Sequence, residues 1–142
     1  MTKPLCINLK SGERIFINGA VLRVDRKVSI EFLNDVSFLL EAHVMQPEQT
    51  TTPFRQLYFI VQTMLIDPVN AGSTKKLFDT SCHRLFGAVS RRDLRTALAD
   101  VRQSVEARRY YEALKTLRSC FVIEDAILEG HTPKRENCNA SE

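Results

Sequence analysis

The sequence predicts an α+β fold in which an antiparallel meander of five short strands, a small sheet or barrel-like unit, precedes about four α-helices. Apolar and polar residues alternate with a period of two in the N-terminal third, and the period becomes helical from Phe54 onward. The 142 residues are 44% hydrophobic, which suffices for one domain with its own core. We therefore expect a β-rich part at 1–46, a helical part at 47–130 that forms one compact unit with it, and a disordered polar tail at 131–142.

The first strand and a hairpin follow from alternation and turn chemistry. Leu5, Ile7 and Leu9 fall on one face of a strand that ends at Ser11-Gly12. A two-residue type I′ turn at Asn18-Gly19 then pairs residue 17 with 20 and residue 15 with 22. The apolar face of this hairpin, which carries Ile15 and Leu22, is expected to point inward.

Two further strands complete the meander. Residues 28–33 alternate through Val28, Ile30 and Phe32, and residues 36–41 follow a turn at Asn34-Asp35. A sheet this small has exposed edges, so we expect closure, dimerisation or a covering helix.

Four helices are predicted after the boundary at residues 46–56. Thr52 is the expected N-cap and Pro53 the first residue of the first helix, which Asp67-Pro68 ends. The third helix is expected to open at Ser90 with Asp93 three residues later, as a shortened capping box. The fourth should run from about Arg109 to Gly130. The apolar stripes of the last three helices are expected to include Leu77, Phe78, Cys82, Leu85, Leu94, Leu98, Val101, Val105, Leu114, Leu117, Phe121, Ile127 and Leu128.

No pattern in the sequence predicts catalysis, a metal site or a cofactor. The four cysteines are never within CxxC distance, and glycine-rich phosphate loops and GxSxG are absent. Cys82 and Cys120 are expected to pack as small reduced hydrophobes. Neither a secretory signal nor an apolar run of bilayer length occurs, so we expect a cytoplasmic protein without a membrane partner.

The hairpin brings two like charges together and thereby suggests an RNA-binding face. The predicted register sets Arg14 opposite Arg23, which repel one another unless an anion lies between them. Phe16 shares their face and offers a ring for an unstacked base, while Arg26 and Lys27 at the next turn extend the basic surface. The alternative is that Phe16 and Val21 face the helices and the two arginines lie at the rim.

A second basic group is predicted on the later helices. Residues 84–118 contain nine Lys or Arg against four Asp or Glu. Arg91, Arg92 and Arg95 can share a side with Arg102, away from the apolar stripes. They suit RNA phosphates or the acidic residues of another protein. Alternatively, they form a solvated helix face with acid–base pairs.

Three sequence blocks resemble the FlbT family of flagellar regulatory proteins over about Leu5 to Glu129. The blocks are LKSGERIFINGAVLRV, TPFRQLYFIVQTML and YYEALKTLR, in that order. The resemblance implies a small cytoplasmic regulator that associates with the 5′ untranslated region of flagellin mRNA and promotes its decay. In some species the same family favours flagellin production instead. The resemblance implies no catalytic residues.

A fainter resemblance links SGERIFINGAVLRV to the first hairpin of the carbon storage regulator, a dimeric mRNA-binding protein built of short strands. It implies a precedent for binding messenger leaders, and a homodimer is a possible state here. The competing hypothesis is an adaptor or activator without RNA contact, which binds flagellin or a companion flagellar regulator through the third and fourth helices.

Overall fold

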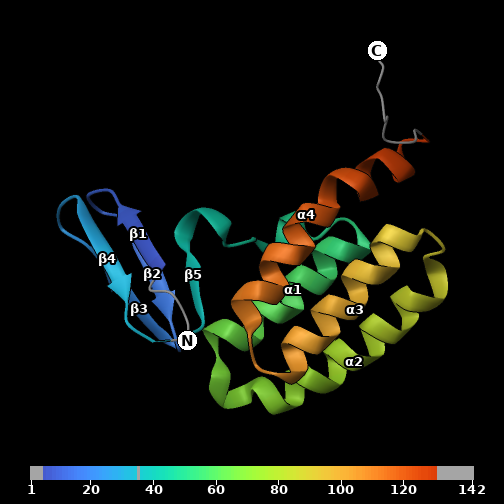
Figure 1. Cartoon of the computed structure of the whole chain (residues 1–142), viewed down its shortest axis with the longest axis horizontal. Helices are drawn as coiled ribbons and strands as arrows, with labels where there is room; N and C mark the ends of the chain where they lie inside the picture. Colours follow the sequence, from blue (N-terminus) through green and yellow to red (C-terminus); the bar gives the residue numbers. More distant parts are fainter. Residues whose placement is uncertain (1–4, 35, 131–142) are drawn as a thin grey trace.

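The computed structural model describes residues 5–34 and 36–130 and confirms the α+β class. In the described chain, five antiparallel strands come first and four α-helices follow, with three short 3-10 turns (Figure 1). The strands are β1 Leu5–Leu9, β2 Arg14–Ile17, β3 Ala20–Arg23, β4 Val28–Phe32 and β5 Phe38–Leu40. The helices are α1 Pro53–Ile66, α2 Ala71–Ala88, α3 Arg92–Glu106 and α4 Tyr110–Leu128. The predicted tail at 131–142 lies outside the described residues.

The strands do not form one continuous meander or a closed barrel. They divide into a two-stranded sheet, β1–β4, and a three-stranded sheet in the order β3–β2–β5. Among the strands of the described residues, only β2 and β3 are sequence neighbours that pair with each other. The alternation of apolar and polar residues predicted the strands. It does not determine which strands pair, because every short alternating strand offers the same row of backbone N–H and C=O groups at its edge.

The hairpin forms in the predicted register. Arg14 lies opposite Arg23 and Phe16 opposite Val21, and Asn18 and Gly19 have φ values of 47° and 86°. Both positive values are those that a type I′ turn requires. A Cβ on Gly19 would lie 3.2 Å from Pro68, so this turn packs closely against the end of α1.

The three-stranded sheet lies between the two-stranded sheet and the helices. On one face, Ile15 is fully buried in a cluster with Ile7 and Leu9 of β1. On the other face, Leu39 belongs to the helical core and Phe16 packs against that core. Figure 1 shows this order, with β5 nearest the helices. Each face of this sheet therefore has a different neighbour.

The helices enclose the larger core. Helix α1 packs against α2 and α4, and α3 packs against α4. Thr52 caps α1 as predicted: its hydroxyl accepts a hydrogen bond from the backbone N–H of Arg55, and Pro53 is the first helical residue. Cys82 and Cys120 are buried, which confirms their predicted packing. Within residues 5–34 and 36–130, none of the helices has the length and apolar character needed to cross a bilayer.

Some helix and packing predictions are wrong. Arg91, not Ser90, is the N-cap residue of α3, and its side chain makes no capping hydrogen bond. Four side chains that were expected to make apolar contacts are exposed, because periodicity predicts which residues share a face but not whether another element covers that face. They are Leu22, Leu77, Ile127 and Leu128.

Candidate nucleic-acid interface

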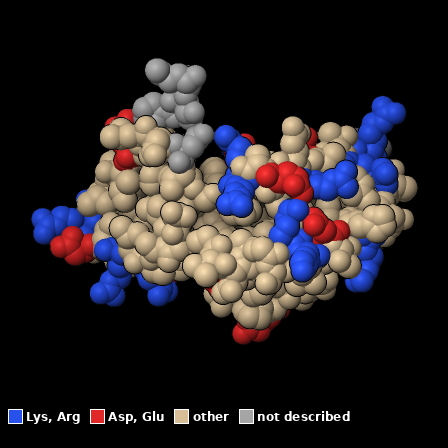
Figure 2. All heavy atoms as spheres, turned by 90° about the horizontal axis from the view of Figure 1, so that it is seen from below, with Lys and Arg blue, Asp and Glu red and all other residues tan. Residues whose placement is uncertain are grey.

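The cations of the hairpin and of the turn that follows it, which were predicted to contact RNA, lie at one end of the strands. The turn after β1 and the turn after β3 are joined by hydrogen bonds from the N–H of Gly12 to the carbonyl of Val24, 2.8 Å, and from the hydroxyl of Ser11 to the carbonyl of Asp25, 3.1 Å. We call residues 10–14 and 23–27, with the neighbouring Glu41, the sheet end. Figure 2 shows basic and acidic side chains together at the strand-bearing end of the molecule.

Arg14 has an internal partner that the sequence did not predict. Its Nη2 lies 2.9 Å from Oε2 of Glu41, its Nε donates to the same oxygen, and its backbone N–H donates to Oε1 at 2.9 Å. These hydrogen bonds and the guanidinium charge lower the pKa of Glu41, and the carboxylate raises the pKa of Arg14. The opposed arginines therefore need no external anion to coexist, since Glu41 neutralises one of them.

The remaining cations of the sheet end differ in their pairing. Arg26 lies 3.3 Å from the carboxylate of Asp25, and both side chains are exposed. Arg23, Lys27 and Lys10 are also exposed, and none of them forms an ion pair with a residue in the described ranges. These three are the candidates for contact with an external anion, and Arg23 and Lys27 are the two that the sequence analysis predicted.

Phe16 does not lie open to solvent as a stacking platform. It is half-buried and packs against the helical core. The first part of the alternative holds for this ring, which packs against the helical core. Val21, on the same face, is exposed, so the alternative does not hold for Val21. RNA contact by the arginines and Lys27 stays a prediction.

The predicted helical cations have separate surroundings. Arg91 pairs with Asp93 at 2.8 Å. Nη1 of Arg95 donates to the carbonyls of Phe86 and Val89 at 2.7 and 2.8 Å, so this residue caps the end of α2. Arg102 lies over the Phe86 ring, 5.0 Å from its centroid.

Arg92 is exposed and forms no ion pair within the described residues. Over the helices, Figure 2 shows basic groups interrupted by acidic ones. The structure therefore does not bring the helical cations into one continuous patch, and the internal role of Arg95 makes it a poor candidate for RNA contact.

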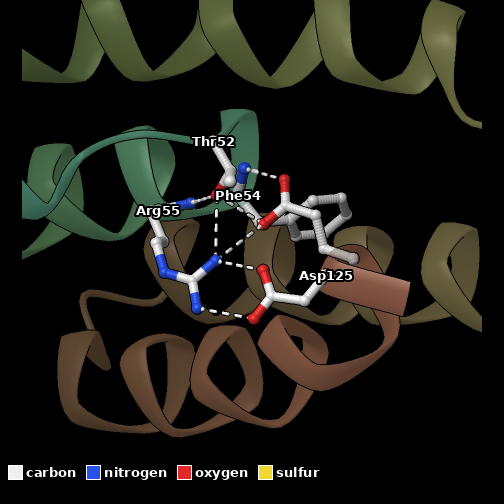
Figure 3. A network of polar contacts seen from close by, with 5 residues as sticks. Thr52, Phe54, Arg55 and Asp125 are labelled. Atoms are coloured by element: carbon white, nitrogen blue, oxygen red, sulfur yellow. Dashed lines mark hydrogen bonds and ion pairs between the residues drawn. The ribbon is translucent and has the colours of Figure 1, made fainter. Parts of the chain in front are cut away.

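A polar network between α1 and α4 is a feature that the sequence analysis missed (Figure 3). The carboxylate of Glu124, 5% exposed, accepts hydrogen bonds from the Thr52 hydroxyl at 2.5 Å and from the Phe54 N–H at 2.8 Å. Arg55 lies 3.6 Å from Glu124 and donates to both carboxylate oxygens of Asp125, at 2.7 and 3.0 Å. The network satisfies N–H groups at the start of α1 and joins α1 to α4. Its sequence signal is the acidic pair within the apolar run FVIED.

Buried polar side chains of α1 also hold the segment after β5. Gln62 accepts a hydrogen bond from the N–H of Met45 at 2.7 Å and donates to its carbonyl at 2.9 Å. Tyr58 donates to the carbonyl of His43 at 2.6 Å and accepts from Arg118. Burial, and secondarily the Arg118 charge, lower the pKa of His43. These contacts fix the segment that carries Glu41, the partner of Arg14.

Comparisons with known proteins identify the family. The family described as "Flagellar protein FlbT" matches residues 5–128. The chain is 51% identical over 131 residues to "Probable flagellum biosynthesis repressor protein FlbT" of Rhizobium johnstonii, covering 92% of this chain and 88% of the relative. It is 50% identical over 128 residues to the protein of the same name in Agrobacterium fabrum, covering 90% and 86%.

A third relative, "Probable flagellum biosynthesis repressor protein FlbT 2" of Bradyrhizobium diazoefficiens, is 49% identical over 124 residues, with coverage of 87% and 91%. No solved structure matches the chain significantly. The family match and these identities, over most of each chain, show that this chain belongs to the FlbT family of flagellar proteins.

Proposed function

We propose that this chain represses flagellum biosynthesis after transcription, by associating with the 5′ untranslated region of flagellin mRNA and promoting its degradation. The names of the relatives, which describe probable flagellum biosynthesis repressors, support the repressor role. The RNA contact is supported by the family resemblance and by the charge of the sheet end. The flagellin leader is the proposed partner, and the cytoplasm is the proposed site of action.

The excess of cations at the sheet end is the observation that carries the RNA proposal. The sheet end contains five cations and three carboxylates, so its formal net charge is +2. The cations are Lys10, Arg14, Arg23, Arg26 and Lys27, and the acids are Glu13, Asp25 and Glu41. Three of these cations, Lys10, Arg23 and Lys27, are exposed and have no carboxylate partner among the described residues. We assign phosphate contact to Arg23 and Lys27, the two that the hairpin and the turn after it predicted.

A salt series with purified protein tests this contact. Fluorescence anisotropy would measure the affinity for flagellin leader RNA and for unrelated RNA of the same length. We expect preference for the leader and a linear fall of the logarithm of affinity with the logarithm of salt concentration. Removing two phosphate contacts by Arg23→Gln and Lys27→Gln together should reduce that slope by about 1.4, at about 0.7 per contact with a single strand.

The matched control removes two exposed cations elsewhere. Lys76 and Arg84 lie on α2, are exposed and form no ion pair within the described residues. The double variant Lys76→Gln/Arg84→Gln has the same net charge as the sheet-end variant. Equal slopes in the two variants would contradict a specific role of the sheet end. In cells, the sheet-end variant should lengthen the half-life of flagellin mRNA.

A second candidate function, a protein-binding flagellar adaptor or activator without RNA contact, is favoured by strand β3. In the described sheet, β3 pairs only with β2, and its four residues are all exposed. Val21 and Leu22 are 57% and 43% exposed. An unpaired edge with apolar side chains suits the addition of a strand from flagellin, a companion flagellar regulator or a second copy of this chain.

The adaptor function makes a different prediction from RNA binding. The purified chain would not bind leader RNA without an added protein, but would co-elute with flagellin in size-exclusion chromatography. Val21→Glu should then abolish co-elution, because it places a charge on the docking edge. Binding of leader RNA by the purified chain alone would contradict this candidate.

A further inference from the structure

A hollow lies at the other end of the β1–β4 sheet, where it meets the turn between α3 and α4. Its volume is about 600 Å³, within the range of small-molecule sites. Its walls include Leu5, Phe32, Leu33, Phe38, Arg108 and Tyr111. Leu5 begins β1, whereas Lys10 and the rest of the sheet end follow its last residue, so the two sites occupy opposite ends of the strand.

One wall of the hollow is aromatic. Phe38 stacks on Tyr111 with centroids 4.2 Å apart and planes 21° apart, and Phe32 lies 5.0 Å from Phe38. Beside these rings, Leu33 is 82% exposed and Leu5 is 41% exposed. A planar ligand in the hollow would remove this apolar surface from water.

Arg108 holds an unfavourable backbone conformation at the rim. Helix α3 ends with hydrogen bonds from the N–H of Arg108 to the carbonyl of Val105 and from the N–H of Arg109 to that of Ser104. This motif places Arg108 at φ 60°, the left-handed position that glycine usually occupies. Asn18 also has a positive φ, but asparagine is favoured in its turn. Arginine at residue 108 has no such local advantage.

Among the described residues, the two arginines that line the hollow differ in their charge pairing. Arg109 pairs with Glu112. The exposed Arg108 forms no ion pair within the described residues. Arg108 lines this hollow and also a second one beside the ends of α1 and α3. A non-glycine residue held in this backbone conformation at a hollow motivates a hypothesis of function.

We infer that this hollow binds a nucleotide, with the base against the wall formed by Phe32, Leu33 and Tyr111 and the phosphate on Arg108. Aromatic rings stack with any base, and the planar guanidinium fork suits phosphate oxygens. The inference rests on the proposed function in one respect: the nucleotide is taken to belong to an RNA strand that also reaches the sheet end. A free mononucleotide offers the same chemistry, and the experiment separates the two sources.

The test uses the full chain with three probes: adenosine monophosphate, a fluorescein-labelled adenosine octanucleotide and inorganic phosphate. We expect both nucleotide probes to shift the NMR signals of the Tyr111 ring, whereas phosphate at the same concentration binds more weakly. Arg108→Gly should weaken binding of both nucleotide probes by about tenfold or more, because a charge-assisted hydrogen bond is lost. The same variant should raise the melting temperature by a few degrees, because glycine relieves the left-handed strain.

A second variant tests the wall without touching the charge. Leu33→Ala changes an exposed side chain and should leave the melting temperature unchanged while weakening nucleotide binding severalfold. Unchanged nucleotide affinity in Arg108→Gly, or Tyr111 signals that no nucleotide shifts, would overturn the inference. Tighter binding of the acidic peptide acetyl-Phe-Asp-Asp-amide than of adenosine monophosphate would also overturn it, in favour of a protein ligand.

The outcomes separate this inference from the proposed function. Leader RNA that binds wild type and Arg108→Gly equally would overturn the nucleotide site and leave the sheet-end contact standing. Binding of adenosine monophosphate with no binding of leader RNA would contradict the proposed function. It would support the hollow as a site for a free nucleotide.

Discussion

The helical part and the strand part of this chain differ in how completely they bury their side chains. In the described residues, the cluster between the two sheets contains four buried members, Ile7, Leu9, Ile15 and Phe38, whereas the helical cluster draws buried residues from all four helices. Strand β3 has no buried residue. The helices therefore supply most of the stability, while the strands leave charges, a strand edge and apolar side chains available for contact.

The largest expected effects come from matched truncations in the two cores. Leu98 of α3 is 0% exposed and Leu9 of β1 is 3% exposed. Leu98→Ala should cost about 4–5 kcal/mol of unfolding free energy and Leu9→Ala about 2–3 kcal/mol, because neighbours of Leu9 are less constrained and relax into the cavity. Urea unfolding measures both. Equal losses of unfolding free energy in the two variants would contradict the conclusion that the helical core contributes more stability than the core between the sheets.

The next effect concerns the network that joins α1 to α4. Glu124→Gln replaces one of two acceptor oxygens with a donor that faces the Thr52 hydroxyl or the Phe54 N–H. The expected loss is about 1–3 kcal/mol of unfolding free energy, from an unsatisfied buried group. The control is Glu112→Gln on the same helix, an exposed residue whose loss should stay within about 0.5 kcal/mol. A loss no larger than that of the control would show that the network is dispensable.

Two glycines test how closely the hairpin turn packs against the helical part. Gly12 and Gly19 have φ values of 83° and 86°, but only a Cβ at Gly19 would meet Pro68. Both alanine variants should lose about 1 kcal/mol from left-handed strain. Gly19→Ala should lose more, because Pro68 must also move. Equal melting temperatures would indicate that the turn does not press on the helical part.

Acid should weaken both parts through carboxylates that arginines stabilise. Arg55 lowers the pKa of Asp125, and Arg14 lowers that of Glu41, in both cases chiefly by a side-chain hydrogen bond. Each contribution is complete above the unfolded-state pKa, about 4, and is lost as pH falls through the lower folded-state pKa. The melting temperature should therefore fall below about pH 4, and less steeply in Asp125→Asn. If the melting temperature of that variant depends on pH as in the wild type, Asp125 does not contribute to the loss of stability in acid.

The smallest effect separates the two opposed arginines. Arg14→Gln should lower the melting temperature slightly, because it breaks the Glu41 contact. Arg23→Gln should raise it slightly, because it removes a like charge without breaking an ion pair of the described residues. Differential scanning calorimetry at low salt measures both shifts. Shifts of the same sign would contradict the assignment of Glu41 to Arg14 alone.

The sequence predicted some parts of the site and missed others for identifiable reasons. The Arg14–Arg23 register followed from the Asn18-Gly19 turn, since a tight turn fixes pairing over a few residues. The Arg14–Glu41 pair joins residues 27 positions apart, and the Thr52–Glu124 bond joins residues 72 apart. No local pattern specifies such contacts. Arg95 lies at the surface as predicted, but its contact with the end of α2 was missed because that contact depends on how α2 and α3 pack.

By itself, the sequence determined the α+β class, the hairpin register, the start of α1 and the family. These follow from turn chemistry, periodicity and short-range capping, which act between neighbours along the chain. Only the tertiary structure decided the division into two sheets, the burial of Phe16 against the helices and the hollow beside Arg108. Those features depend on which surfaces pack against one another and exclude water. Residues that are distant in the sequence determine that packing.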